Sequence, residues 1–153
     1  MARAVKGMLG VVADVLVADG RPFQVQSDGQ TLQFEFAAAD VTWRCFVRVL
    51  DERIVLVYSQ LPQRVLRVRR AAVIELITRL NYELPLGNLE MDLADGEVRF
   101  RTSIDIVAIA LDQDGVRQLL HTNVTETGRL LPAIEAVADG RAAPATAADL
   151  ARQ

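Results

Sequence analysis

The chain of 153 residues contains one cysteine, Cys45, and one histidine, His121. A single cysteine excludes an intramolecular disulfide and any zinc site built on several cysteines, and a single histidine excludes a metal site that needs two imidazoles. Thiol–imidazole catalysis would require Cys45 and His121 to meet in space. Cys45 falls in the middle of an expected strand, where a free cysteine typically behaves as a small buried hydrophobe. We therefore expect Cys45 to belong to the core.

The motifs of nucleotide-binding and acyl-transfer enzymes are also missing. Gly7 and Gly10 lack the spacing and the preceding strand of a Rossmann or P-loop turn, and the sequence contains no nucleophile elbow. Glu90 and Asp92 would share one face of a strand, as paired carboxylates in acid–base catalysis do. Arginines predicted on the facing strand favour a structural role for both. We expect no enzymatic activity, no cofactor and no bound metal.

Long apolar runs and an excess of one charge are absent as well. The run 8–13 follows Arg3 and Lys6, as in a signal peptide, but Asp14 ends it, and no stretch reaches the length of a membrane helix. Seventeen basic and twenty acidic residues give a net charge of −3, which disfavours a general electrostatic footprint for nucleic acid. Apolar residues make up 51% of the chain, so we expect a globular protein. The short apolar run near the N-terminus favours a location in the cytoplasm.

The stretch 70–106 predicts a helix followed by a tight hairpin. Apolar residues recur at helical spacing from Val73 to Leu84, and Pro85 and Gly87 end the helix. The alternating residues 88–93 then lead into the turn pair Asp95-Gly96, a strong hairpin signal. With Asp95 and Gly96 as the two loop residues, counting outward pairs Asp92 with Arg99 and Glu90 with Arg101. These four residues are predicted to form a structural charge ladder.

The same stretch resembles a known family. Residues 81–92 and 95–103 are similar to the YbjN-domain family of bacterial proteins, and the similarity continues at 119–120, 123–124 and 131–134. The chain departs from the family pattern at Gly128 and Leu130, where an acidic and an aromatic residue are expected nearby. The resemblance implies an α+β fold like that of type III secretion chaperones, of order α-β-β-β-α-β-β-α, with an antiparallel sheet packed by helices. It also implies a chain that usually dimerises and no known catalytic residues.

The remaining elements follow from periodicity and turn signals. A helical stripe runs through 2–18, and Asp28-Gly29 predicts a hairpin that pairs Val25 with Leu32 and Phe23 with Phe34. A long helix is expected from Asp112 through Ile134. It continues past Pro132, because Gly128 at position i−4 has no Cβ. We expect a single domain over 1–138, and the alanine-rich segment 139–153 reads as a mobile tail or a frayed helix.

A third hairpin joins 41–50 to 53–61, and its loop length cannot be counted from the sequence. One face is expected to carry Trp43 and Cys45, and the reverse face to place Arg44, Phe46 and Arg48 opposite Ser59, Val57 and Val55. A single layer of helices would leave this half-apolar reverse face exposed to solvent, and exposed apolar surfaces usually bind another protein chain. The candidate dimer or partner interface is therefore Arg44, Phe46, Arg48, Val55 and Val57. The competing explanation is that the N-terminal helix crosses to that face.

Four arginines, Arg64, Arg67, Arg69 and Arg70, precede the central helix. They could clamp an anionic partner, or they could form a solvated loop and first turn. Two functions remain open. The first is a non-enzymatic, cytoplasmic protein-binding module, chaperone-like or a regulatory adaptor, that forms a homodimer and holds an unidentified protein or peptide. The alternative is a nucleic-acid accessory protein that uses the arginine cluster together with Arg44 and Arg48.

Overall fold

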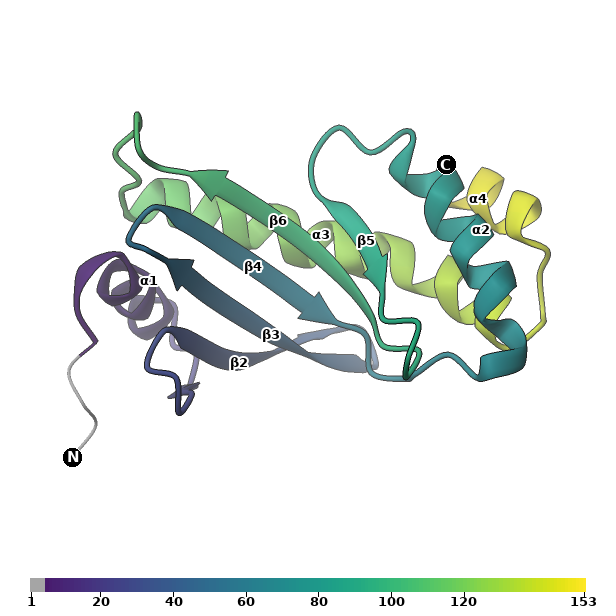
Figure 1. Cartoon of the computed structure of the whole chain (residues 1–153), viewed down its shortest axis with the longest axis horizontal. Coiled ribbons are helices and arrows are strands. Elements are labelled where there is room, and N and C mark those ends of the chain that lie inside the picture. The colour runs from purple at the N-terminus through teal and green to yellow at the C-terminus, as the bar shows by residue number, and fades with distance from the viewer. Residues whose placement is uncertain (1–4) are drawn as a thin grey trace.

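A six-stranded antiparallel sheet with helices against one of its faces organises the computed structural model, which describes residues 5–153 (Figure 1). The elements are, in order, α1 (Gly7–Ala18), β1 (Phe23–Val25), β2 (Thr31–Ala38), β3 (Val41–Leu50), β4 (Ile54–Gln60), the 3₁₀ turn η1 (Arg67–Arg69), α2 (Arg70–Asn81), β5 (Asn88–Met91), β6 (Val98–Asp105), α3 (Gln113–Ala138) and α4 (Pro144–Ala151). Arg3 and the first residues of the expected helix 2–18 lie outside the described residues.

The strand order is β1-β2-β3-β4-β6-β5, and every neighbouring pair is antiparallel. The expected α+β class, with an antiparallel sheet packed by helices, is confirmed. The chain has one strand and one helix more than the order that the resemblance implied. The additional elements are the three-residue edge strand β1 and the C-terminal helix α4.

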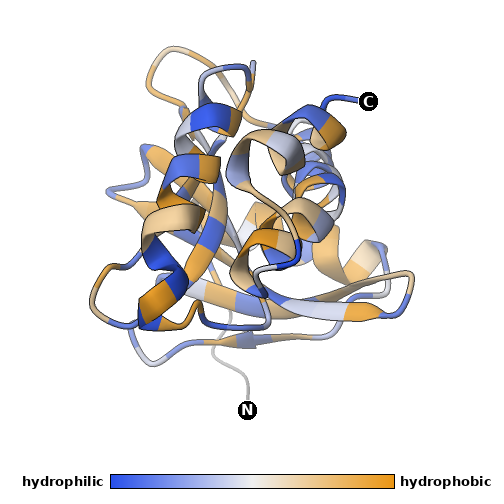
Figure 2. Ribbon diagram, turned by 90° about the vertical axis from the view of Figure 1, so that its right-hand side faces the viewer, coloured by the Kyte–Doolittle hydropathy of each residue, from blue (hydrophilic) through white to orange (hydrophobic). Residues whose placement is uncertain are grey.

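The core lies between the sheet and the helices. Along β3 and β4 the buried residues alternate with half-exposed or exposed ones, as expected of a sheet with one covered face. Helix α3 runs behind the sheet with α1 beside it, and α2 and α4 pack together at the β5 end (Figure 1). Seen from that end, apolar and polar positions alternate along the strands (Figure 2). Helices α1, α2 and α3 thus cover the same face, and α4 packs on α2 and α3.

The long helix α3 begins and continues as its sequence predicts. Asp112 is its N-cap and accepts a hydrogen bond from the Gly115 N–H at 2.9 Å. The helix passes Pro132 without ending and extends to Ala138. Gly128, at position i−4, lacks the Cβ that would crowd the turn facing the proline ring. The prediction of a helix that accommodates Pro132 is confirmed.

The first hairpin has the predicted register, with Val25 opposite Leu32 and Phe23 opposite Phe34. In the next hairpin, β3 and β4 are joined by the three-residue loop 51–53, so that Cys45 faces Ser59. Asp51 and Glu52 both adopt φ of +51°. This left-handed backbone lets the Glu52 carboxylate accept a hydrogen bond from the Met8 N–H, 2.8 Å away at the start of α1. A contact between distant segments therefore accompanies this unusual loop.

The register predicted for β5 and β6 is wrong by two residues. Glu90 lies opposite Arg99, not Arg101, and Asp92 lies in the loop, outside the ladder. The loop is longer than two residues because contacts outside the hairpin hold it. The Gly96 carbonyl accepts from the Val65 N–H at 2.8 Å, and a Cβ on Gly96 would come within 2.2 Å of the Val65 carbonyl oxygen. A slip of two keeps every side chain on its predicted face.

Of the two alternatives expected for the segment after Asp139, a mobile tail and a frayed helix, the structure shows a helix, and it is packed against the protein. Pro144 opens helix α4, a position where its fixed φ suits a helix. Ala147 and Ala148 are both buried, and Arg152 forms an ion pair with Glu83 at 2.6 Å. The small side chains that suggested disorder are the feature that allows α4 to approach α2 and α3 closely.

Candidate functional site

The face of the sheet that carries no helix is the candidate site, and we call it the open face. Its centre is formed by Phe46 on β3 and by Leu56 and Tyr58 on β4, with Phe46 and Tyr58 directly opposite each other. All three side chains are half-buried by their neighbours in the sheet. The sheet lies in front of α3 in Figure 1, so this face looks toward the viewer. An apolar centre on an uncovered sheet face is the arrangement that association surfaces use.

Four arginines surround this centre, and two of them are held in place. The Arg99 guanidinium lies 4.3 Å from the centroid of the Tyr58 ring, a cation–π contact. Glu90 pairs with Arg99 at 2.8 Å and with Arg101 at 2.9 Å. The predicted charge ladder thus exists in a different form, because one carboxylate joins both arginines. Asp92 accepts a hydrogen bond from the Ala94 N–H instead.

The other two arginines, Arg44 and Arg48, are exposed. Neither forms an ion pair or a side-chain hydrogen bond with any residue in the described range 5–153. Glu35 and Thr31 are their cross-strand neighbours on β2. At the far end of the same face, Arg53 donates to the Asp105 carboxylate at 2.7 Å and lowers the pKa of Asp105. The rim therefore holds both paired charges and two cations available to a partner.

Val55 and Val57 do not belong to this face, which corrects the predicted interface. Both are buried in the core, where Val57 pairs with Val47 and Val55 with Val49. The three-residue loop sets the register, so the odd-numbered positions of β4 point inward and the even-numbered ones outward. Ile54, Leu56 and Tyr58 take the places assigned to the two valines. Arg44, Phe46 and Arg48 lie on the predicted face.

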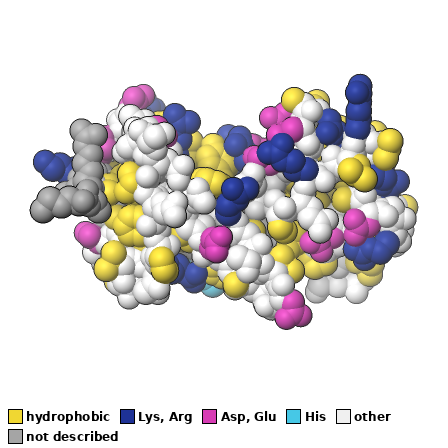
Figure 3. Space-filling model, turned by 90° about the horizontal axis from the view of Figure 1, so that it is seen from below, with side chains coloured by type: hydrophobic (Ala, Val, Ile, Leu, Met, Phe, Trp, Pro, Cys, Tyr) yellow, Lys and Arg dark blue, Asp and Glu magenta, His cyan; other side chains and the backbone are white. Residues whose placement is uncertain are grey.

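The arginine cluster before α2 is largely used by the fold. Arg64 forms ion pairs with Asp95 and, at 3.8 Å, with Glu97. Arg69 donates to the Val137 carbonyl at 2.6 Å, and Arg70 donates to carbonyls of the β5–β6 loop. Figure 3 shows the molecule from below, and basic and acidic side chains are interspersed over the surface seen in this view. Only Arg67 of the four makes no such contact among the described residues.

The two residues considered for thiol–imidazole catalysis lie in different environments. Cys45 is fully buried, and burial raises the pKa of its thiol to about 11. His121 is exposed on α3. Within residues 5–153, no group of three or more histidine, cysteine or acidic side chains is placed to hold a metal ion. The described helices include none long and apolar enough to span a membrane.

One buried polar cluster escaped prediction from the sequence. Ser59, Thr102, Asn123 and Thr127 are all buried between the sheet and α3. The indole N–H of Trp43 donates to the Ser59 hydroxyl at 2.9 Å, and Ser59 donates to the Asn123 side-chain oxygen at 2.6 Å. The available signal was the presence of Asn123 and Thr127 on the apolar stripe of α3. Every polar atom in the cluster has a partner, so it is a structural element and leaves no group free for a ligand.

A family model described as "YbjN: Putative bacterial sensory transduction regulator" matches residues 9–136. No curated protein matches the sequence. Among solved structures, the chain is similar to the Yersinia pestis type III secretion chaperone SycH, crystallised in complex with a stable fragment of YscM2. That similarity has 12% identity and a TM-score of 0.48 over 76% of this chain and 92% of the other, which is too distant to bear on function.

Proposed function

The chain belongs to the YbjN family, and from that premise we propose that it is a non-enzymatic protein-binding module that acts as a homodimer in the cytoplasm. A regulatory adaptor of this kind is compatible with the sensory transduction role that the family description names. The observation that carries the proposal is the open face. Its centre, Phe46, Leu56 and Tyr58, lies on the side of the sheet opposite all four helices.

A second copy of the chain is the occupant that we propose for the open face. Two sheets stack face to face about 10 Å apart, and a two-fold axis places the same patch on both partners. Phe46 and Tyr58 would then lose their remaining contact with water. Arginine is enriched at interfaces, and the exposed Arg44 and Arg48 provide the polar rim. The paired Glu90 and the neighbouring Glu35 supply the opposite charge that a self-complementary face needs.

Phe46→Asp tests the dimer. Sedimentation velocity should give twice the chain mass for the wild type and the single chain mass for the variant, because a carboxylate at the centre of the interface would be buried without a partner. Tyr82→Asp is the matched control, since Tyr82 is an aromatic residue that is 91% exposed outside the sheet. That variant should remain dimeric.

A second substitution guards against a folding defect. Leu56→Lys replaces another member of the open face with a side chain that keeps its stem on the sheet, and circular dichroism checks that both variants fold. A wild type of single-chain mass, or folded Phe46→Asp and Leu56→Lys variants that both keep the wild-type mass, would refute the homodimer.

Nucleic acid is the competing partner, and the exposed Arg44 and Arg48 are the observation in its favour. Arg64, Arg69 and Arg70 already bind groups of this chain, which disfavours binding of a nucleic-acid phosphate by the arginine cluster. A salt titration of binding to labelled DNA and RNA separates the two functions, because phosphate contacts give a steep decrease of affinity with log salt. We expect no salt-sensitive binding.

A further inference from the structure

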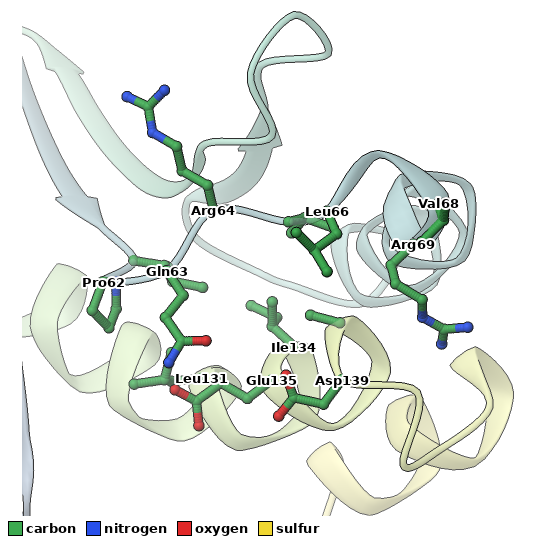
Figure 4. Close-up of a pocket in the computed structure, with 13 residues that line it drawn as sticks. Pro62, Gln63, Arg64, Leu66, Val68, Arg69, Leu131, Ile134, Glu135 and Asp139 are labelled. Atoms are coloured by element: carbon green, nitrogen blue, oxygen red, sulfur yellow. The ribbon is translucent and has the colours of Figure 1, made fainter.

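A second surface lies away from the open face, in the groove between the connection 61–69 and the C-terminal half of α3. The groove has a volume of about 520 Å³, within the usual range for ligand sites. Its apolar floor is formed by Leu61, Val65, Leu131 and Ile134, all of which are buried. Figure 4 shows Leu66 on the connection and Ile134 and Glu135 on α3 on opposite sides of this space.

Two large apolar side chains of the groove wall face water. Leu66 is 70% exposed and Val68 is 85% exposed, although the backbone that carries them is fixed. Val65 binds the Gly96 carbonyl through its N–H, and its own carbonyl accepts from Arg70 Nε at 3.2 Å. The Arg69 N–H donates to the Leu66 carbonyl at 2.8 Å and closes the 3₁₀ turn. The fold therefore holds an exposed apolar pair rigidly beside an apolar floor.

The acidic group that this groove offers to a ligand is the carboxylate of Glu135. The two arginines of the groove are engaged, Arg64 with Asp95 and Glu97, and Arg69 with the Val137 carbonyl at the end of α3. Glu135 forms no ion pair or side-chain hydrogen bond with any residue of the described part of the chain. Asp139, one helical turn further, pairs with Arg141 at 3.0 Å.

The position of these two carboxylates strengthens the preference for a cation. Glu135 and Asp139 are spaced i, i+4, so their charges repel each other. They also lie at the C-terminal end of α3, where the negative end of the helix dipole disfavours further negative charge. Arg69 at the Val137 carbonyl and Arg141 at Asp139 already offset part of this negative charge, so Glu135 is the group that a Lys or Arg side chain entering the groove would pair with. An acidic side chain would instead be repelled by Glu135.

We propose that this groove binds a segment of a partner protein that carries large apolar side chains next to a Lys or Arg. The apolar side chains pack on Leu66, Val68 and the floor at Ile134, and the cation reaches Glu135. The proposal rests on the protein-binding role inferred above but not on the homodimer, since no residue of the open-face centre lines the groove.

A random peptide library displayed on phage, selected against the immobilised full-length protein, provides the probe. We expect the enriched peptides to combine large apolar residues with Lys or Arg. A synthetic peptide of the enriched sequence is then titrated by fluorescence anisotropy. The double variant Leu66→Asp/Val68→Asp should weaken binding by more than about tenfold, and Glu135→Lys by about tenfold with a lower salt dependence.

Two controls accompany the titration. Val17→Asp changes an apolar residue on α1 that is 67% exposed, close to the 70% of Leu66, and should leave peptide binding unchanged. Phe46→Asp should also bind the peptide with wild-type affinity, whatever its mass. Because Leu66 and Val68 are exposed, their replacement leaves the core intact, and circular dichroism checks this.

Enrichment of acidic peptides, the absence of any enriched peptide, or binding that the groove variants leave unchanged would overturn the proposal. Failure of the homodimer is distinguishable from these outcomes, because sedimentation measures it without the peptide.

Discussion

Asn123 joins α3 to the neighbouring strands β4 and β6. Its side-chain nitrogen Nδ2 donates to the Val57 carbonyl at 3.0 Å, to the Phe100 carbonyl at 3.3 Å and to the Thr102 hydroxyl at 3.2 Å. Its oxygen accepts from the Ser59 hydroxyl at 2.6 Å. A buried polar residue with every partner in place specifies one position of the helix on the sheet, because any shift would leave several groups unpaired.

Replacing Asn123 should therefore be costly. We expect Asn123→Ala to lower the free energy of unfolding by about 2–4 kcal/mol, since the partners remain buried without it. Urea denaturation measures the change. Gln118→Ala, at an exposed position of the same helix, is the control and should stay within about 0.5 kcal/mol of the wild type. A change of that small size at Asn123 would show that the cluster is not required for stability.

Cys45 provides a test of burial through pH. Burial raises the pKa of its thiol to about 11, above the value of about 8.5 of an unfolded cysteine. Between these values the unfolded chain loses a proton that the folded chain keeps, so this thiol lowers stability as the pH rises, and it has no such effect below about pH 8. The excess loss of stability in alkali should disappear in Cys45→Ala.

Denaturation of both proteins at about pH 8 and about pH 10 measures this difference. The comparison with Cys45→Ala removes the contribution that both proteins share at these pH values. The folded thiol should also fail to react with a disulfide reagent near pH 8, because the thiolate is the nucleophile. Rapid reaction without unfolding would show that Cys45 is accessible.

At the scale of elements, α4 shows how small residues create a packed helix. Ala147 and Ala148 are each 1% exposed, where α4 meets α2 and α3. Alanine has the highest helix propensity and no bulk to keep neighbouring backbones apart. The same composition that predicts a mobile tail from the sequence permits this close contact.

The packing of α4 predicts that a larger side chain lowers the stability at Ala147 but not at Ala145. Ala147→Leu should destabilise the protein by about 1–3 kcal/mol, because the added atoms have no space between the helices. Ala145→Leu, at an exposed position of the same helix, should have little effect. Thermal or urea unfolding of the two variants measures the difference. Equal stabilities would indicate that α4 does not dock on α2 and α3 in solution.

At the scale of the whole molecule, all four helices lie on one side of the sheet, and this division separates the two proposed surfaces. The open face is built from β3, β4 and β6, whereas the groove is built from α3 and the connection before α2. In a dimer formed through the open faces, both grooves would remain accessible. Two linked sites of this kind would raise the avidity for a partner that carries two copies of the segment.

The sequence by itself determined much of this protein. Helical periodicity predicted α2 and α3, including the passage through Pro132, and alternation predicted which residues of β3 point inward. The Asp28-Gly29 turn predicted the register of β1 and β2 correctly. These features succeed because they depend on neighbours a few positions apart, where the spacing of apolar residues and the turn residues are sufficient.

Only the tertiary structure decided the registers of the other two hairpins. In the β3–β4 loop Glu52 contacts the start of α1, and in the β5–β6 loop Gly96 contacts Val65. The length of the β3–β4 loop decides which side chains of β4 point outward. The length of the β5–β6 loop decides which charged residues lie opposite each other. The membership of Tyr58 in the open face and the link of Glu90 to two arginines were therefore settled by contacts between segments far apart in the chain, which the local pattern of residues does not contain.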